Sequence, residues 1–271
     1  MMESAVGPSP QLSLRVSAAT LSRIVFPHPN DNSLTLALEH KATLHHFEDK
    51  PVVTLMAQPF GGAVRIVKPQ ILLNSITEFS YDSERSLAEK DLRIFIQPSK
   101  WPALLEICRH EAALGEQAAL DHDPVRELVE EFEDTLGIQL MSDDYTLESV
   151  GLVIEKVPHP TANVRAPGYP TARVYWVDEV RITDGDMCRQ MLNAGLSTEA
   201  LREKAMEDWK NGGPGRANAI FTAPLKQLRA AYLKLSPEER SAPLEFEGVT
   251  LSSNVPAILE SVDTPTFEGV G

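Results

Sequence analysis

Short runs of β-branched and other apolar residues, separated by turn-forming residues, constrain the fold of the first hundred residues more than any other feature. Runs of this length and composition are typical of strands, whose side chains alternate across a pleated sheet. They predict strands at residues 12–16, 34–38, 42–47, 52–57, 63–67 and 92–96. The first half of the chain is therefore expected to be mainly sheet.

Helical patterns and further strands alternate in the second half. Pro102 suits the first turn of a helix that begins near Trp101. Asp123 and Pro124 form the clearest helix start, an N-cap acid followed by proline, and Gly137 is expected to end that helix. Further strands are predicted at 149–156, 172–183 and 219–222, and further helices at 186–193, 198–210, 225–235 and 255–262.

The order of these elements indicates an α+β fold, because strands and helices are mixed without a regular βα alternation. The chain shows no internal repeat and no sharp change of composition. We therefore predict a single domain over residues 12–262, with insertions and a C-terminal helical extension. Residues 1–11 and 263–271 are expected to be loose ends.

The charge balance limits the partners that the chain can bind. Lys and Arg total 25 against 39 Asp and Glu, which gives a formal net charge of -14. Such a field repels polyanions, so it disfavours a nucleic acid duplex or an anionic membrane as partner. It attracts metal ions, which can bridge a protein to a phosphorylated small molecule. We expect a phosphorylated small-molecule substrate, and a homodimer stays open.

The cysteines and the N-terminal residues indicate the cellular compartment in which the protein is expected. Cys108 and Cys188 are the two cysteines, and their wide separation predicts neither a disulfide framework nor a structural zinc site. Residues 1–11 lack a basic region followed by an apolar run, and no apolar stretch approaches the roughly 18 residues of a membrane span. These features predict a cytoplasmic protein.

The helix that starts at Pro124 has an acidic face. On a helical wheel four carboxylates lie opposite the apolar residues. The carboxylates are Glu127, Glu130, Glu131 and Asp134, and the apolar residues are Val125, Leu128, Val129, Phe132 and Leu136. Like charges three or four residues apart destabilise a helix by a few tenths of a kcal/mol per pair. A divalent cation bound between the carboxylates would make their contribution to helix stability favourable. A metal site and a solvated acidic surface are both open interpretations.

Two segments resemble parts of the Nudix hydrolase signature. Residues 126–131 read Arg-Glu-Leu-Val-Glu-Glu and are followed by Gly137-Ile138, which is similar to the second half of the Nudix box. Residues 59–62 read Pro-Phe-Gly-Gly, which is similar to the Pro-Gly-Gly turn before the box, with one residue intervening. The resemblance implies a mixed sheet sandwiched between helices.

The resemblance also implies a site and its cofactor. Glu127, Glu130 and Glu131 match the family's metal ligands for Mg²⁺ or Mn²⁺, and Arg126 matches the arginine that steadies them. These four residues are the predicted catalytic group. Gly61, Gly62 and, in a proline-rich loop, Arg165 are the candidates for substrate binding.

The function implied by the resemblance is that of a Nudix-type pyrophosphohydrolase, which cleaves a diphosphate linkage in a nucleoside diphosphate derivative. Ala112 and Ala118 stand where the family pattern has Gly and Glu. A non-catalytic Nudix-fold protein that binds or senses a ligand is therefore the alternative. A structural protein whose acidic helix is only surface is the third interpretation.

A glycine-rich segment at residues 212–216, Gly-Gly-Pro-Gly-Arg, is the last feature of note. Its backbone N–H groups and Arg216 could surround a phosphate. It lacks the lysine and Ser/Thr of a phosphate-binding P-loop, so a plain connecting loop is the favoured interpretation.

Overall fold

A computed structural model describes residues 6–47, 50–114, 118–135, 137–155, 158–160, 166–236, 239 and 242–259. The chain divides into two compact units, each assembled from three stretches of sequence. Unit 1 comprises Met1–Thr20, Gly62–Pro124 and Gly151–Trp176, and unit 2 comprises Leu21–Gly61, Val125–Val150 and Val177–Gly271. The expectation of a single domain over residues 12–262 stays a prediction.

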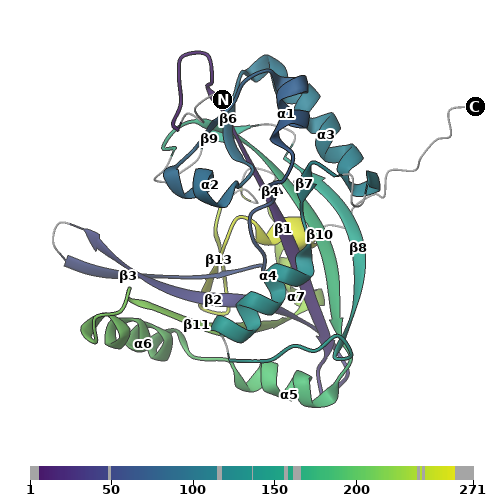
Figure 1. The fold of residues 1–271 in the computed structure, drawn as a ribbon. Helices are drawn as coiled ribbons and strands as arrows, with labels where there is room; N and C mark the ends of the chain where they lie inside the picture. Colours follow the sequence, from purple (N-terminus) through teal and green to yellow (C-terminus); the bar gives the residue numbers. More distant parts are fainter. Residues whose placement is uncertain are drawn as a thin grey trace, which may run out of the picture. The chain divides into compact units, whose positions relative to one another are not determined.

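Strands and helices are mixed along the chain, as expected for an α+β fold (Figure 1). The strands are β1 (Leu14–Pro27), β2 (Leu34–Phe47), β3 (Lys50–Gln58), β4 (Arg65–Ile66), β5 (Ser80–Tyr81), β6 (Arg93–Ile96), β7 (Leu120–Asp121), β8 (Tyr145–Ile154), β9 (His159–Pro160), β10 (Pro170–Ile182), β11 (Arg216–Pro224), β12 (Leu244–Phe246) and β13 (Val249–Leu251). The α-helices are α1 (Pro69–Ile76), α2 (Glu84–Glu89), α3 (Trp101–Leu114), α4 (Pro124–Glu130), α5 (Gly185–Asn193), α6 (Thr198–Lys210), α7 (Leu225–Leu233) and α9 (Val255–Leu259). A 3₁₀ turn at Pro98–Lys100 precedes α3, and a π-helix at Glu131–Thr135 follows α4.

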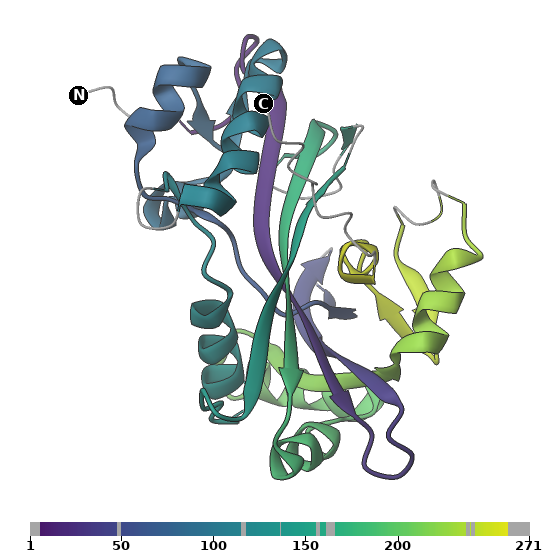
Figure 2. The same ribbon diagram turned by 90° about the vertical axis from the view of Figure 1, so that its right-hand side faces the viewer.

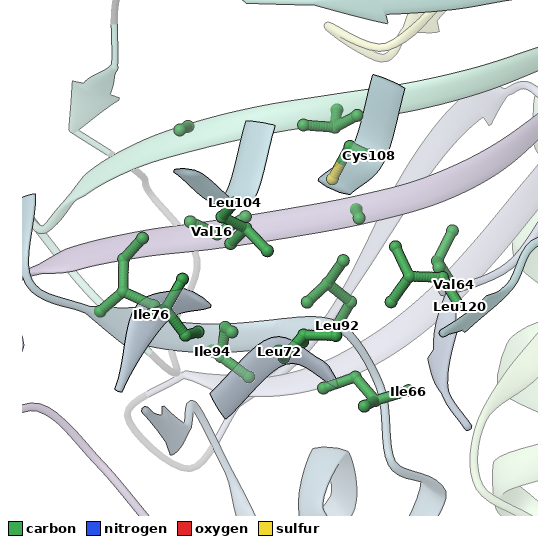
Figure 3. Close-up of a cluster of buried hydrophobic side chains, with 14 of the residues drawn as sticks. Val16, Val64, Ile66, Leu72, Ile76, Leu92, Ile94, Leu104, Cys108 and Leu120 are labelled. Atoms are coloured by element: carbon green, nitrogen blue, oxygen red, sulfur yellow. The ribbon is translucent and has the colours of Figure 1, made fainter. Parts of the chain in front are cut away.

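An apolar cluster forms the core of unit 1. Alternate residues of β1 point into this core, because successive side chains of a strand point to opposite faces. Strand β6 pairs antiparallel with β1 and contributes to the same cluster. Figure 3 shows Val16 of β1 and Ile94 of β6 with Leu72 and Ile76 from α1 and Leu104 and Cys108 from α3. Leu104 and Cys108 lie four residues apart, on one face of α3. Burial of Cys108 makes this thiol part of the core.

A buried ion pair accompanies the unit 1 core. The guanidinium of Arg15 donates from Nη2 to Oδ2 of Asp82 at 2.6 Å, and the two side chains are 4% and 0% exposed. Ser83 and Ser86 donate their hydroxyls to Oδ1 of Asp82. Every described polar contact of this carboxylate is therefore with a neighbouring side chain, which fixes α2 against β1.

The sheet of unit 2 is organised around β2. On one edge β2 pairs with β11 from Thr35 to Thr43, and on the other edge β3 pairs with its residues Glu39–Phe47. Both pairings are antiparallel, whereas β13 joins β3 in parallel, so the sheet is mixed. The β12–β13 hairpin leads directly into α9, both drawn in yellow tones in Figure 2.

Helix α6 covers one face of this sheet, beside β11 in Figure 1. Its bounds match the predicted helix at 198–210, because Ser197 accepts a hydrogen bond from the N–H of Ala200 and caps the first turn. Leu201 and Ala205, one turn apart, pack on Ala42 and Ala219 of the sheet. Small side chains at the contact allow helix and sheet to approach closely.

Several expectations are corrected by the structure. The predicted strands at 34–38 and 42–47 form the single strand β2, because residues 39–41 between them remain in the ladder, where Glu39 and His40 are only 1% exposed. Glu39 tolerates burial because it accepts from Gln58 and pairs with Lys41. The β12–β13 hairpin has no counterpart among the predicted strands, and its turn uses positive φ at Glu247 and Gly248.

The glycine-rich segment at 212–216 is a connecting loop. The N–H groups of Gly215 and Arg216 both donate to Oδ2 of Asp208, at 2.8 and 3.0 Å. A carboxylate of the chain therefore occupies the backbone donors that were candidates for a phosphate.

Within the described ranges, no helix is both long and apolar enough to cross a membrane.

Replacing Asp82 with Asn is expected to lower the free energy of unfolding by roughly 3–5 kcal/mol, because the Arg15 guanidinium would stay buried without its counter-charge. Urea unfolding followed by circular dichroism measures the change. A double variant, Arg15→Met with Asp82→Leu, should recover most of the loss. A cost below about 1 kcal/mol for Asp82→Asn alone contradicts the assignment.

The same pair gives a pH dependence. Burial opposes ionisation of Asp82, but hydrogen bonds from Ser86, Arg15 and Ser83 outweigh it and hold the pKa of Asp82 below its usual value. A group with a lowered folded-state pKa stabilises fully above its unfolded pKa of about 3.9, and the contribution is lost as pH falls through the folded-state pKa. The difference in unfolding free energy between the native chain and Asp82→Asn should therefore shrink on acidification. A constant difference down to about pH 2 is the contrary result.

Candidate functional site

The acidic helix begins and ends where the sequence predicts. The N–H of Asp123 bonds to the carboxylate of Asp121, and Pro124 is the first residue of α4. At the far end Gly137 has a φ of 66°, and the N–H of Ile138 bonds to the carbonyl of Phe132 at 2.9 Å. A left-handed residue and a bond of this type are typical of a helix C-terminus.

The apolar face of the helix packs into the core of unit 2, as predicted. Leu128 and Phe132 are buried with residues of β1, β10 and α5. The rings of Phe132 and Phe60 lie 5.0 Å apart between centroids. Phe60 is the residue that intervenes in the Pro-Phe-Gly-Gly turn, so an aromatic contact holds this turn against the helix.

A change in helix type alters the acidic face. The wheel assumed a regular α-helix throughout, but the chain becomes a π-helix at Glu131–Thr135. A π-helix bonds residue i to i+5, so residues after Glu130 leave their expected angular positions. Glu131 is half-exposed, whereas Phe132 is buried, and a metal site and a solvated surface both remain open interpretations of the acidic face.

The carboxylate of Glu131 meets the glycine turn. Its Oε2 accepts a hydrogen bond from the N–H of Gly61 at 2.9 Å. Gly61 has a φ of 141°, which side-chain-bearing residues rarely adopt, and the carbonyl of Phe60 accepts from the N–H of Ser22 at 2.8 Å. Positive φ and the anchored neighbour together direct the Gly61 amide to Glu131. The carbonyl of Gly62, in unit 1, accepts from the N–H of Thr20.

Glu130 differs from Glu131 in its surroundings. Its side chain is 56% exposed, and its Oε1 lies 4.0 Å from Nη1 of Arg126, one turn earlier. This spacing places the arginine next to the carboxylate, as the family resemblance implies, although an ion pair this long and exposed contributes little to stability. The side chain of Glu127 and the whole of Arg165 lie outside the described residues.

The donor set suits a hard cation. A search of the described residues finds no group of three or more His, Cys, Asp or Glu that could hold a metal, and the side chains of Glu127 and Asp134 lie outside that search. The carboxylates of Glu130 and Glu131 remain on the described helix. Mg²⁺ is commonly held by one or two carboxylates together with waters and substrate phosphates, so these residues fit it. The metal-ligand roles of Glu127, Glu130 and Glu131 stay a prediction.

Sequence reasoning found Gly61 and Glu131 separately but missed the bond between them. It also missed Phe60, which the resemblance treats as an extra residue. One sequence feature could have indicated this bond. Phe60 precedes Gly61 and Phe132 follows Glu131, so a contact between the two aromatic rings would bring Gly61 and Glu131 together.

Comparison with known proteins adds one distant likeness. No family model and no curated protein matches the chain. Among solved structures, a crystal structure of a mutT/nudix family protein from Listeria innocua aligns with a TM-score of 0.31 and 10% sequence identity, over 79% of this chain and 82% of that chain. A TM-score this low carries no argument about this chain, so its function has to be argued from the site.

Proposed function

We propose that the helix at 124–135 is the cation-binding element of a metal-dependent hydrolase that cleaves a diphosphate linkage in a nucleoside diphosphate derivative. The hydrogen bond between the Gly61 amide and the Glu131 carboxylate carries this proposal. It joins two segments 70 residues apart, which separately resemble the Nudix turn and the Nudix box. An acidic helix that served only as solvated surface would not be expected to bond to this glycine turn.

The bond has a consequence for ligand binding. A carboxylate with one oxygen fixed by a backbone amide keeps its orientation, and partners of this kind orient the ligands of many metal sites. Glu130, exposed beside Arg126, presents a second carboxylate on the same helix. These two side chains would hold the cation in the described part of the site, with Glu127 as the third ligand by resemblance.

The chain's own residues have distinct roles in this proposal. When bound, Mg²⁺ or Mn²⁺ would neutralise the diphosphate and make a water nucleophilic near pH 7. Arg126 would position Glu130, and Gly61 would let the substrate approach the backbone closely, because it carries no side chain. Phe60 and Phe132 would keep turn and helix at a fixed separation.

The non-catalytic alternative rests on a separate observation. Ala112 and Ala118 replace the Gly and Glu of the upstream half of the family pattern, and alanine supplies no donor oxygen on its side chain. Under this alternative the turn and helix hold a phosphorylated ligand without cleaving it. Ligand-dependent stabilisation without product release would distinguish it from the hydrolase.

Glu131→Gln tests the hydrolase directly. The change keeps size but removes the charge, so release of nucleoside monophosphate from a panel of dinucleotides and sugar nucleotides should fall by about two orders of magnitude or more in Mg²⁺ or Mn²⁺. Glu133→Gln is the matched control, because Glu133 is exposed on the same π-helix and its substitution removes the same charge. Equal turnover in the native chain, Glu131→Gln and Glu133→Gln would remove Glu131 from the site, and an inactive native chain would contradict the hydrolase proposal.

A stability comparison separates a ligand role from a purely structural one. Glu131→Ala loses the acceptor for the Gly61 amide and should cost about 1–3 kcal/mol of unfolding free energy. Glu131→Gln keeps a carbonyl oxygen that can accept the same bond and should cost less than about 1 kcal/mol. Saturating Mg²⁺ should raise the melting temperature of the native chain and leave that of Glu131→Gln nearly unchanged. Equal Mg²⁺ responses in the two proteins contradict a ligand role for Glu131.

A further inference from the structure

Unit 2 contains a cavity away from the acidic helix. It has a volume of about 280 Å³ and lies between the start of α6, strands β2 and β3, and the turn of the β12–β13 hairpin. Its wall includes His40, Val53, Leu55, Thr198, Arg202 and Val249. The volume is at the small end of the range for small-molecule sites.

His40 is a buried polar group without a partner. It is 1% exposed and contributes to the cavity wall, with its ring edge-to-face against Phe221 at 6.3 Å. In the part of the chain that the structure describes, neither ring nitrogen makes a hydrogen bond. Because the ring lines the cavity, its chemical environment changes when the cavity is occupied.

The protonation state of His40 decides whether the ring adds charge to the cavity. Burial lowers the pKa of His40, so the imidazole is neutral near pH 7. A neutral imidazole offers one donor and one acceptor and adds no charge to the cavity.

The charge in the cavity wall comes from α6. Arg202 follows Thr198 by four residues, so the two side chains lie on one face of the helix, at the cavity. Arg202 forms no ion pair with any carboxylate that the structure describes, although the chain carries a net charge of -14. Thr198 is the first residue of a 13-residue helix, whose N-terminal N–H groups favour negative charge.

The apolar part of the wall comes from β3 and β13, and Gly248 and Thr250 complete the lining. Val53 and Leu55 are two residues apart on β3 and therefore share a face of the sheet, and Val249 lies on β13, which pairs beside β3. A ligand that uses both parts of the wall must combine one anionic group with a short apolar body.

We propose that this cavity binds a small monocarboxylate. The carboxylate bonds to Arg202 and to the first turn of α6 at Thr198, and the apolar body lies against Val53, Leu55 and Val249. One guanidinium matches one negative charge and the two oxygens of a carboxylate. A phosphate dianion would bring a second charge that no described residue of the wall neutralises.

Nuclear magnetic resonance of the His40 ring tests the proposal on the full chain. Sodium isovalerate, added at about pH 8 where the imidazole is neutral, should shift the His40 resonance saturably in the millimolar range. Inorganic phosphate and isopentyl alcohol, which lack the apolar body and the charge respectively, should bind at least about tenfold more weakly. A His40→Gln variant identifies the resonance.

Two variants and a control locate the carboxylate. Arg202→Gln should weaken isovalerate binding by about tenfold or more, and Thr198→Val should weaken it by about threefold or more. Lys204→Gln removes a positive charge from the exposed side of α6, outside the cavity wall, and should leave the affinity unchanged. The proposal is overturned by no saturable shift, by phosphate that binds as well as isovalerate, or by equal affinity in the native chain and Arg202→Gln.

Discussion

Pairing on both edges of β2 is the constraint on which unit 2 depends. Because β11 and β3 both bond to this strand, Glu39 and His40 are carried into the interior, where polar side chains are otherwise disfavoured. The register that opposes Gln58 to Glu39 also fixes the end of β3, and the Pro-Phe-Gly-Gly turn starts at the next residue. One strand thus places both the turn that contacts Glu131 and the histidine that lines the cavity.

The elements that sequence predicts well are those with strong local signals. The start of α4 at Pro124 and the left-handed Gly137 each depend on a residue with a marked backbone preference. Strand β2 is predicted as two strands because Lys41 lies between its apolar runs, whereas the burial of Glu39 and His40 depends on pairing with β3 and β11, which are distant in sequence. The π-helix was not predicted from the sequence, and Phe132 within it packs against Phe60 from a distant segment.

The same division applies to the candidate site. A match to a family pattern singled out Glu131 and Gly61 individually, and the helical wheel placed Glu130 and Glu131 on one face. The structure gives them different environments: Glu130 is exposed beside Arg126, whereas Glu131 bonds to a backbone amide. A helical wheel treats neighbours as equivalent, and only the tertiary contact distinguishes the carboxylate with a fixed orientation.

The net charge of -14 acts in opposite directions on the two proposed sites. It attracts a divalent cation toward Glu130 and Glu131, so the acidic helix needs few additional contacts to gain occupancy. It repels an anion, so the cavity can bind a carboxylate only if short-range contacts outweigh the long-range field. Arg202, the N-terminal amides of α6 and the apolar wall are such contacts, and each acts within a few ångströms, where screening by salt is weakest. Added salt therefore weakens the cation site through loss of attraction, while it reduces the repulsion that a carboxylate meets on its approach to the cavity.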